Sequence, residues 1–244
     1  MKRWKNLMFL LLAFMVSADA QTATKVAENI DTYMIGEDTL KLHFFGHASL
    51  MLEYRNRCIY IDPVNPYADY RLLPKADIIL ITHEHRDHLD PEAIAAIRKT
   101  ETVLLANAKA AEKIPGARVI RNGESREFTE IKVTAVPAYN TSKGRKMFHP
   151  QGKGNGYVLK MGGKYIYVAG DTEDIPEMKK LGEIAIAFLP VNQPYTMTVE
   201  QAAKAAKIIK PEILYPYHYS DTDLAPLLRM LRNSGIEVRI RNMQ

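Results

Sequence analysis

Cysteine is nearly absent from this chain of 244 residues, because Cys58 is the only one. No disulfide can form within the chain, so an apolar core must hold it together, and 47% of its residues are hydrophobic. Cys58 lies in an apolar run in mid-chain, where we expect a small buried strand residue. Low-complexity segments and internal repeats are also lacking, which argues against a solenoid architecture.

A strong excess of charge of one sign is lacking as well. The formal net charge is +5, and Lys2, Arg3 and Lys5 against Asp19 supply +2 of it, which leaves +3 for residues 21–244. Basic and acidic residues are interspersed, without a basic block. A charge this mild argues against nucleic acid as a partner.

Long apolar runs are confined to the N-terminus. Residues 1–6 form a short basic head, residues 7–16 are almost wholly apolar, and Ala18-Asp19-Ala20 ends the segment with small residues. This order is typical of a signal peptide cleaved after Ala20. The alternative is a membrane anchor, but the apolar run falls short of the roughly 20 residues that span a bilayer. We therefore predict a signal peptide over residues 1–20, export to the periplasm or the exterior, and no stable membrane anchor after cleavage.

The rest of the chain is patterned as one domain. Residues 21–38 are polar and weakly patterned, which predicts a ragged N-terminal lead-in, and residues 39–244 alternate short strands with helices. This order indicates an α/β domain with two sheets and outer helices. The predicted strands are 39–45, 48–54, 57–61, 77–82, 102–106, 118–120, 131–137, 157–161, 164–169, 184–189, 213–215 and 237–241. The predicted helices are 91–99, 108–113, 198–210 and 223–234.

A cluster of histidines follows the apolar strand predicted at 77–82. Three of the seven histidines, His83, His85 and His88, lie within six residues together with Asp87. Imidazole nitrogens and carboxylate oxygens suit Zn²⁺, and also Mn²⁺ or Fe²⁺. A polar loop with histidines by chance is the plainer interpretation, but the density of ligands directly behind a buried strand favours a metal site.

The segment His83-x-His85-x-Asp87-His88 resembles the signature of the metallo-β-lactamase-fold hydrolases. Three other segments occur in that family's order within residues 39–241. They are Tyr60-Ile61-Asp62-Pro63 before this segment, and Gly170-Asp171-Thr172 and His218 after it, the last behind a late strand. Phe45-Gly46-His47-Ala48-Ser49 is similar to the opening of the subgroup that contains ascorbate-6-phosphate lactonase and N-acyl-phosphatidylethanolamine phospholipase D. The resemblance implies a four-layer αββα sandwich of two mixed sheets with outer helices.

The resemblance also implies a ligand set for one or two metal ions, with Zn²⁺ expected and Mn²⁺ or Fe²⁺ as alternatives. His83 and His85 would hold one ion, and Asp87, His88 and His218 the other. Asp171 would bridge them, Asp87 would be catalytic, and Asp62 would orient a histidine ligand.

One ligand of the first ion departs from the family's pattern. The usual third histidine follows a strand like 133–137, where this chain has Tyr139 and Asn140. The only histidine in the interval is His149, inside the long loop 138–155, and loops of this length are often functional. We favour His149 as the ligand. The alternatives are a weakly held or absent first ion with Tyr139 or Asn140 nearby, or His149 as a substrate contact.

Further residues are candidates for lining a substrate pocket. His47 lies in a turn beside the predicted site, where it could contact a substrate or a ligand, or simply be satisfied by backbone. Asn192 and Tyr195 follow a buried strand and are candidates of the same kind, as is Tyr139. His43 is expected to be an ordinary strand residue.

The resemblance implies a hydrolase in which a metal-bound hydroxide attacks an ester, lactone or phosphodiester. The partner would be a small-molecule substrate. Two alternatives stay open, namely a metal-binding or ligand-binding protein without catalysis, and a di-iron oxidoreductase, because di-iron relatives share this ligand set. The sequence indicates neither the substrate nor the oligomeric state.

Overall fold

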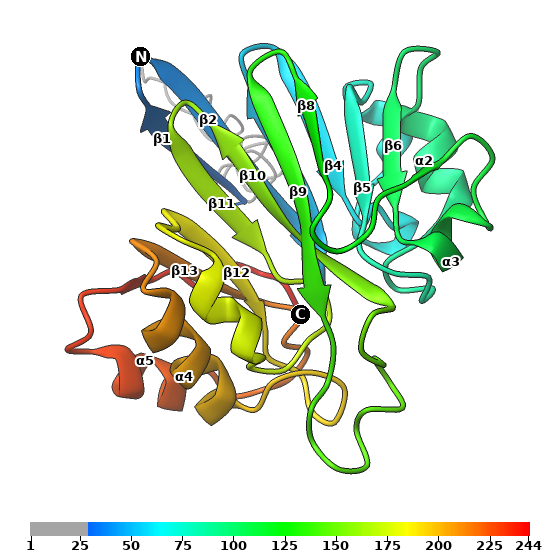
Figure 1. The fold of residues 1–244 in the computed structure, drawn as a ribbon. Coiled ribbons are helices and arrows are strands. Elements are labelled where there is room, and N and C mark those ends of the chain that lie inside the picture. The colour runs from blue at the N-terminus through cyan, green and yellow to red at the C-terminus, as the bar shows by residue number, and fades with distance from the viewer. Residues whose placement is uncertain (1–28) are drawn as a thin grey trace, which may run out of the picture.

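The computed structural model describes residues 29–244 (Figure 1). The predicted signal peptide, residues 1–20, and residues 21–28 of the predicted lead-in lie outside this range. Within it, no helix is long and apolar enough to cross a bilayer.

Two seven-stranded sheets form the centre of the fold, and both run through the same sequence of pairings. In the first sheet, β1 to β4 pair antiparallel and β4 to β7 pair parallel. In the second sheet, β8 to β11 pair antiparallel and β11 to β14 pair parallel. Each half of the chain therefore builds one mixed sheet of the same design.

The strands of the first sheet are β1 (Ile30–Ile35), β2 (Asp38–Gly46), β3 (Ser49–Tyr54), β4 (Arg57–Ile61), β5 (Ile78–Ile81), β6 (Val103–Ala106) and β7 (Arg118–Val119). Those of the second are β8 (Ser125–Phe128), β9 (Ile131–Ala138), β10 (Gly154–Met161), β11 (Lys164–Val168), β12 (Ile186–Pro190), β13 (Ile213–Tyr217) and β14 (Glu237–Val238).

Helices cover the outer faces of the two sheets (Figure 1). On the first sheet these are α2 (Pro91–Ile97) and α3 (Ala108–Ala111), and on the second α4 (Val199–Ile209) and α5 (Ala225–Leu231). Short 3₁₀ helices occur at Asn65–Tyr67, Tyr70–Leu72 and Pro176–Lys180. The predicted αββα sandwich of two mixed sheets is confirmed.

Strand β5 shows why this order of layers is stable. Ile78 and Leu80 pack into the core between the sheets, whereas Ile79 and Ile81 pack into a second core against α2 and α3. Successive strand residues point to opposite faces, so a strand buried on both sides must be apolar throughout. This explains the uninterrupted apolar run before His83.

Local signals in the sequence begin the helices as expected. The Asp90 side chain accepts hydrogen bonds from the backbone N–H groups of Glu92 and Ala93 at the start of α2. Thr198 and Gln201 form the reciprocal capping box of α4. The predicted helix 91–99 thus begins at Pro91 as expected, and the predicted helix 198–210 begins one residue later, at Val199.

The structure differs from the sequence-based expectations at two strands and one side chain. Residues 30–35 of the predicted ragged lead-in form β1, a regular strand paired with β2. Strand β8 was not predicted, because its residues Ser125-Arg126-Glu127-Phe128 are mostly polar on an edge of the second sheet. Cys58 lies in β4 as expected but is half-buried rather than fully buried.

Candidate metal centre

The site lies where several strands of both sheets end. Asp62 follows β4, the segment from Thr82 to His88 follows β5, Asp171 follows β11 and His218 follows β13. These strands end at the same edge of the sandwich, so their following residues converge, as is usual for sites in layered α/β folds.

The backbone turns sharply at several of these positions. The φ angles are 51° at His47, 45° at Asp62 and 47° at His218, which is the left-handed conformation. Residues other than glycine rarely adopt it, and those that do are often found at functional sites. Gly170 has φ 64°, and a Cβ there would lie 2.5 Å from the carbonyl oxygen of Asn155, so only glycine fits before Asp171.

The first group of ligand atoms comprises His83, His85 and His149, which each place one nitrogen within 4.8 Å of the others. His83 Nε2 and His85 Nδ1 are 3.0 Å apart. His149 Nδ1 donates a hydrogen bond to the carbonyl oxygen of Tyr195 at 3.1 Å. That bond fixes the tautomer and leaves Nε2 free to act as a ligand.

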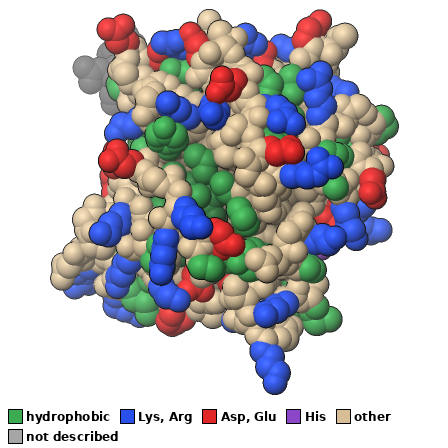
Figure 2. Space-filling view, viewed as in Figure 1, with side chains coloured by type: hydrophobic (Ala, Val, Ile, Leu, Met, Phe, Trp, Pro, Cys, Tyr) green, Lys and Arg blue, Asp and Glu red, His purple; other side chains and the backbone are tan. Residues whose placement is uncertain are grey.

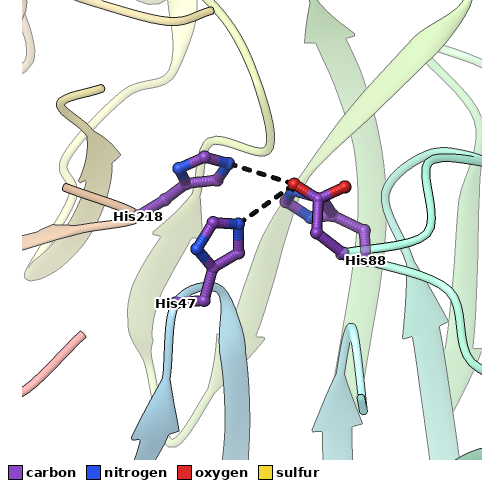
Figure 3. A group of neighbouring side chains, drawn as sticks. His47, His88 and His218 are labelled. Atoms are coloured by element: carbon purple, nitrogen blue, oxygen red, sulfur yellow. Dashed lines mark hydrogen bonds and ion pairs between the residues drawn. The ribbon is translucent and has the colours of Figure 1, made fainter. Parts of the chain in front are cut away.

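The second group comprises His47, Asp87, His88 and His218, again within 4.8 Å of one another. Figure 3 shows the rings of His47 and His218 pointing at the same carboxylate beside His88. His47 Nε2 lies 3.1 Å from Asp87 Oδ2, and His88 Nε2 and His218 Nε2 each lie 3.8 Å from that oxygen.

Asp171 lies between the two groups. Its Oδ2 is 3.2 Å from His149 Nε2 and 3.3 Å from His218 Nε2, and its Oδ1 is 3.4 Å from His88 Nε2. One carboxylate therefore reaches nitrogens of both groups, which is the arrangement that a bridging ligand requires.

Asp62 and Thr82 orient the ligands from behind. The buried carboxylate of Asp62 accepts hydrogen bonds from His88 Nδ1 at 2.8 Å and from Thr82 Oγ1 at 2.6 Å. The first bond fixes the His88 ring with Nε2 toward Asp171. This is the geometry predicted for Asp62, and carboxylates hold metal-binding histidines in this way.

The buried groups of the site shift one another's pKa values strongly. Burial alone would raise the pKa of Asp171, but His218 and His88 outweigh it and hold that pKa well below its usual value. Burial alone would lower the pKa of His88, but Asp171 and Asp62 hold it well above its usual value. Burial and then His88 keep the pKa of His83 well below its usual value.

Four ligand atoms of the site also make no hydrogen bond within residues 29–244. They are His88 Nε2, His149 Nε2, His218 Nε2 and Asp171 Oδ1. Buried polar atoms of this kind are normally paired, because an unpaired one costs roughly 1–3 kcal/mol. Nitrogen and oxygen donors without sulfur fit Zn²⁺, Mn²⁺ or Fe²⁺, so the residues present fit a divalent metal ion.

The other predicted pocket residues lie around the groups rather than in them. Tyr139 directs its hydroxyl to Glu177 at 3.0 Å, and burial raises its pKa to about 12. Asn140 donates to the carbonyl oxygens of Arg145 and Tyr195. Neither side chain belongs to a potential ligand group within residues 29–244, whereas His149 does.

Asn192 and Tyr195 flank the ligands. The amide of Asn192 lies 3.4 Å from His218 Nδ1. Tyr195 supports His149 through its carbonyl oxygen, while its ring packs on Phe148 and its side chain is partly exposed. His43 belongs to no potential ligand group within residues 29–244 and is paired with Glu53 at 2.6 Å.

One residue that the sequence did not point to anchors the loop bearing His149. Glu173 is fully buried, and its Oε2 accepts hydrogen bonds from the backbone N–H groups of Thr141 and Ser142. Its Oε1 lies 3.0 Å from Arg145 Nε. An acidic residue two positions after Asp171 was the only available signal, and acids are too common for it to be decisive.

Comparison with known proteins bears on the same residues. The beta-lactamase superfamily domain matches residues 41–218, a span that contains both ligand groups. The chain belongs to the metallo-β-lactamase superfamily.

Several members of the metallo-β-lactamase superfamily match nearly end to end. A UPF0173 metal-dependent hydrolase of Nanoarchaeum equitans is 31% identical over 83% of this chain and 97% of its own length. A protein of Parabacteroides distasonis assigned as a metal-dependent hydrolase is 54% identical, with a TM-score of 0.86 over 88% of this chain and 99% of that one.

A metallo hydrolase of Ignicoccus hospitalis is 27% identical, with a TM-score of 0.70 over 84% of this chain and 96% of that one. The metallo-β-lactamase fold assignment thus rests on sequence and on structure alike.

Proposed function

We propose that this protein is a metal-dependent hydrolase that cleaves an ester, lactone or phosphodiester bond at the two ligand groups joined by Asp171. The observation that carries the proposal is the convergence of unpaired buried nitrogens and a shared carboxylate on one place. The relatives described as metal-dependent hydrolases support it.

His83, His85 and His149 would hold one ion, and Asp87, His88 and His218 the other. When bound, a divalent ion supplies Lewis acidity, which activates water and withdraws charge from a carbonyl or phosphoryl oxygen. The donor set supports Zn²⁺ first, with Mn²⁺ or Fe²⁺ as alternatives.

The protein's own residues then control access and orientation. His88 and His218 are buried, whereas the side chain of Asp87 is 46% exposed and His85 is exposed. The site therefore opens to solvent past Asp87 and His85. The Asp87 carboxylate accepts a hydrogen bond from the attacking water there and orients it toward the substrate.

The loop that carries His149 favours a negatively charged substrate. Residues 138–155 contain Lys143, Arg145, Lys146 and Lys153 but no acid, and all but Arg145 are exposed. Figure 2 shows Lys and Arg side chains at the lower tip, where Figure 1 places this loop between β9 and β10. Positive charge on a loop that also carries a candidate ligand attracts anions, so a phosphodiester is the best supported of the three substrate classes.

We also propose that the protein acts outside the cytoplasm. The support is the basic head, apolar run and small-residue end of residues 1–20. Fractionation of cells that express the native gene should place the shortened protein, beginning near Gln21, in the exported fraction. A full-length protein in the cytoplasm would contradict this.

The experiment for the activity combines metal analysis with a substrate panel. The metal-loaded protein should hold up to two ions per chain and hydrolyse bis-p-nitrophenyl phosphate faster than lactones or β-lactams. Asp87→Ala should abolish most of this activity, and the matched control His43→Gln should not. If the loaded protein hydrolyses none of the panel, or if Asp87→Ala is as active as the unaltered chain, the proposal is wrong.

A further inference from the structure

His47 is held rigidly although it lies in the turn between β2 and β3. Its backbone N–H donates to the carbonyl oxygen of Gln244 at 3.1 Å, and its own carbonyl accepts the N–H of His218 at 2.8 Å. The same residue has the left-handed φ of 51°. Two segments that are distant in sequence therefore hold its backbone. One of them carries the candidate ligand His218.

The neighbours of Gly46 determine where the His47 ring can lie. A Cβ at Gly46 would lie 2.8 Å from the Tyr67 ring, so glycine lets Tyr67 pack against this turn. Tyr67 in turn stacks on the His47 ring, with centroids 5.5 Å apart and planes 2° apart. The His47 ring also contacts that of His218, with centroids 3.7 Å apart. Two aromatic rings therefore restrain the imidazole.

Asp87 is the opposite case, because it is the most exposed carboxylate of the site and has few restraints of its own. Its side chain is 46% exposed, and among residues 29–244 His47 is the only side chain hydrogen-bonded to it, through Nε2 and Oδ2 at 3.1 Å. The approaches of His88 and His218 to the same oxygen, at 3.8 Å, are too long for hydrogen bonds.

We propose that His47 is a positioning residue, whose Nε2–H holds the carboxylate of Asp87 toward His88 and His218. The inference rests on the proposed function only in assigning Asp87 to the second ligand group. A carboxylate oxygen has two lone pairs, so Oδ2 can accept this hydrogen bond and still serve as a ligand. In this arrangement the proton occupies Nε2, so His47 supports the second group without being a ligand, although its nitrogen lies within 4.8 Å of the ligand atoms.

Two substitutions separate positioning from ligation. In His47→Gln the terminal amide can donate from nearly the position of Nε2, whereas in His47→Asn the shorter amide tolerates the left-handed backbone but does not reach Asp87. His43→Gln is the matched control, since His43 lies on β2, the strand that leads into the turn of His47, and belongs to no ligand group within residues 29–244.

The measurement is metal affinity by competition with a chelator, together with the absorption spectrum of the Co²⁺-loaded protein. Outer partners of metal ligands contribute about 10–100-fold to affinity. We expect His47→Asn to lower the affinity for one of the two Co²⁺ ions by that factor. His47→Gln should keep most of this affinity, and His43→Gln should bind both ions as the unaltered chain does. The Co²⁺ spectrum of His47→Gln should equal that of the unaltered chain, because no ligand is lost.

Three results would overturn the inference. Unchanged Co²⁺ affinity in His47→Asn would show that Asp87 needs no positioning. Equal loss in both variants with an altered spectrum would make His47 a direct ligand. Unfolding of the metal-free His47→Asn protein at a lower denaturant concentration than His47→Gln would make the role structural. None of these readouts uses a substrate, so a failed substrate panel leaves the test of His47 intact.

Discussion

The two ligand groups differ in what holds their side chains. The second group is built on strand ends, with His88 and His218 buried and His88 fixed by Asp62. The first group takes one of its three nitrogens from the long loop, where a single backbone carbonyl, that of Tyr195, orients His149. Since strand ends are more rigid than loops, we infer that the second group binds its ion more tightly and that the first exchanges its ion more readily.

The strongest test of this comparison removes what the groups share. Asp171→Asn keeps the size of the side chain but loses the charge that reaches nitrogens of both groups. We expect binding of both ions to be lost on dialysis and hydrolysis to fall on the order of 1000-fold or more, as loss of metal catalysis predicts. Retention of one ion at normal affinity would mean that the groups are independent.

The next test separates the groups. His149→Ala and His218→Ala should each reduce the metal content from two ions to one, and hydrolysis should fall about 100-fold or more in both. The ion left in His149→Ala should be the slowly exchanging one, and the ion left in His218→Ala the rapidly exchanging one. Isotope exchange of bound zinc measures this difference, and equal exchange rates in the two variants would contradict the comparison.

A smaller effect should follow from loosening the loop without touching a ligand. In Glu173→Gln the buried carboxylate that holds Thr141, Ser142 and Arg145 becomes a neutral amide. We expect affinity at the first group to fall by up to about tenfold and the second group to be unchanged. Glu177→Gln is the control, because within residues 29–244 the only hydrogen bonds to its carboxylate come from the Tyr139 hydroxyl. An equal loss of affinity in Glu177→Gln would show that Glu173 is not a specific anchor of the loop.

The smallest effect lies away from both groups. Burial alone would raise the pKa of Asp31, but hydrogen bonds from Tyr215 and Arg241 outweigh it and lower that pKa. The stability gained is therefore present above the ordinary carboxyl pKa, near 3.9, and is lost as the pH falls through the lower folded-state pKa. Asp31→Asn should reduce the melting temperature at neutral pH but not in strong acid, and leave metal affinity unaltered.

Much of the site could be predicted from the sequence because strand ends are visible in it. Apolar runs before His83, Asp171 and His218 place these residues at one edge of the sandwich, whatever the details of the turns. His149 could be proposed as a ligand only from its position in the loop, since nothing local shows that its ring is turned by the Tyr195 carbonyl.

Contacts between distant segments account for what could not be predicted. Strand β1 is regular because it pairs with β2, although its own residues are weakly patterned. Glu173 anchors a loop more than twenty residues earlier in the chain. The hydrogen bond between His47 and Asp87 joins residues 40 positions apart. No local pattern records such pairings.

The repeated design of the two sheets has a consequence for assembly. The first half of the chain contributes His83, His85, Asp87 and His88, and the second half contributes His149, Asp171 and His218. Each ligand group therefore draws on both halves and is complete only when the two sheets have docked. An ion that binds only the docked form stabilises docking by mass action. Such ions would link the two sheets at one edge of the core that they share, and the free metal concentration would set how much this link adds to stability.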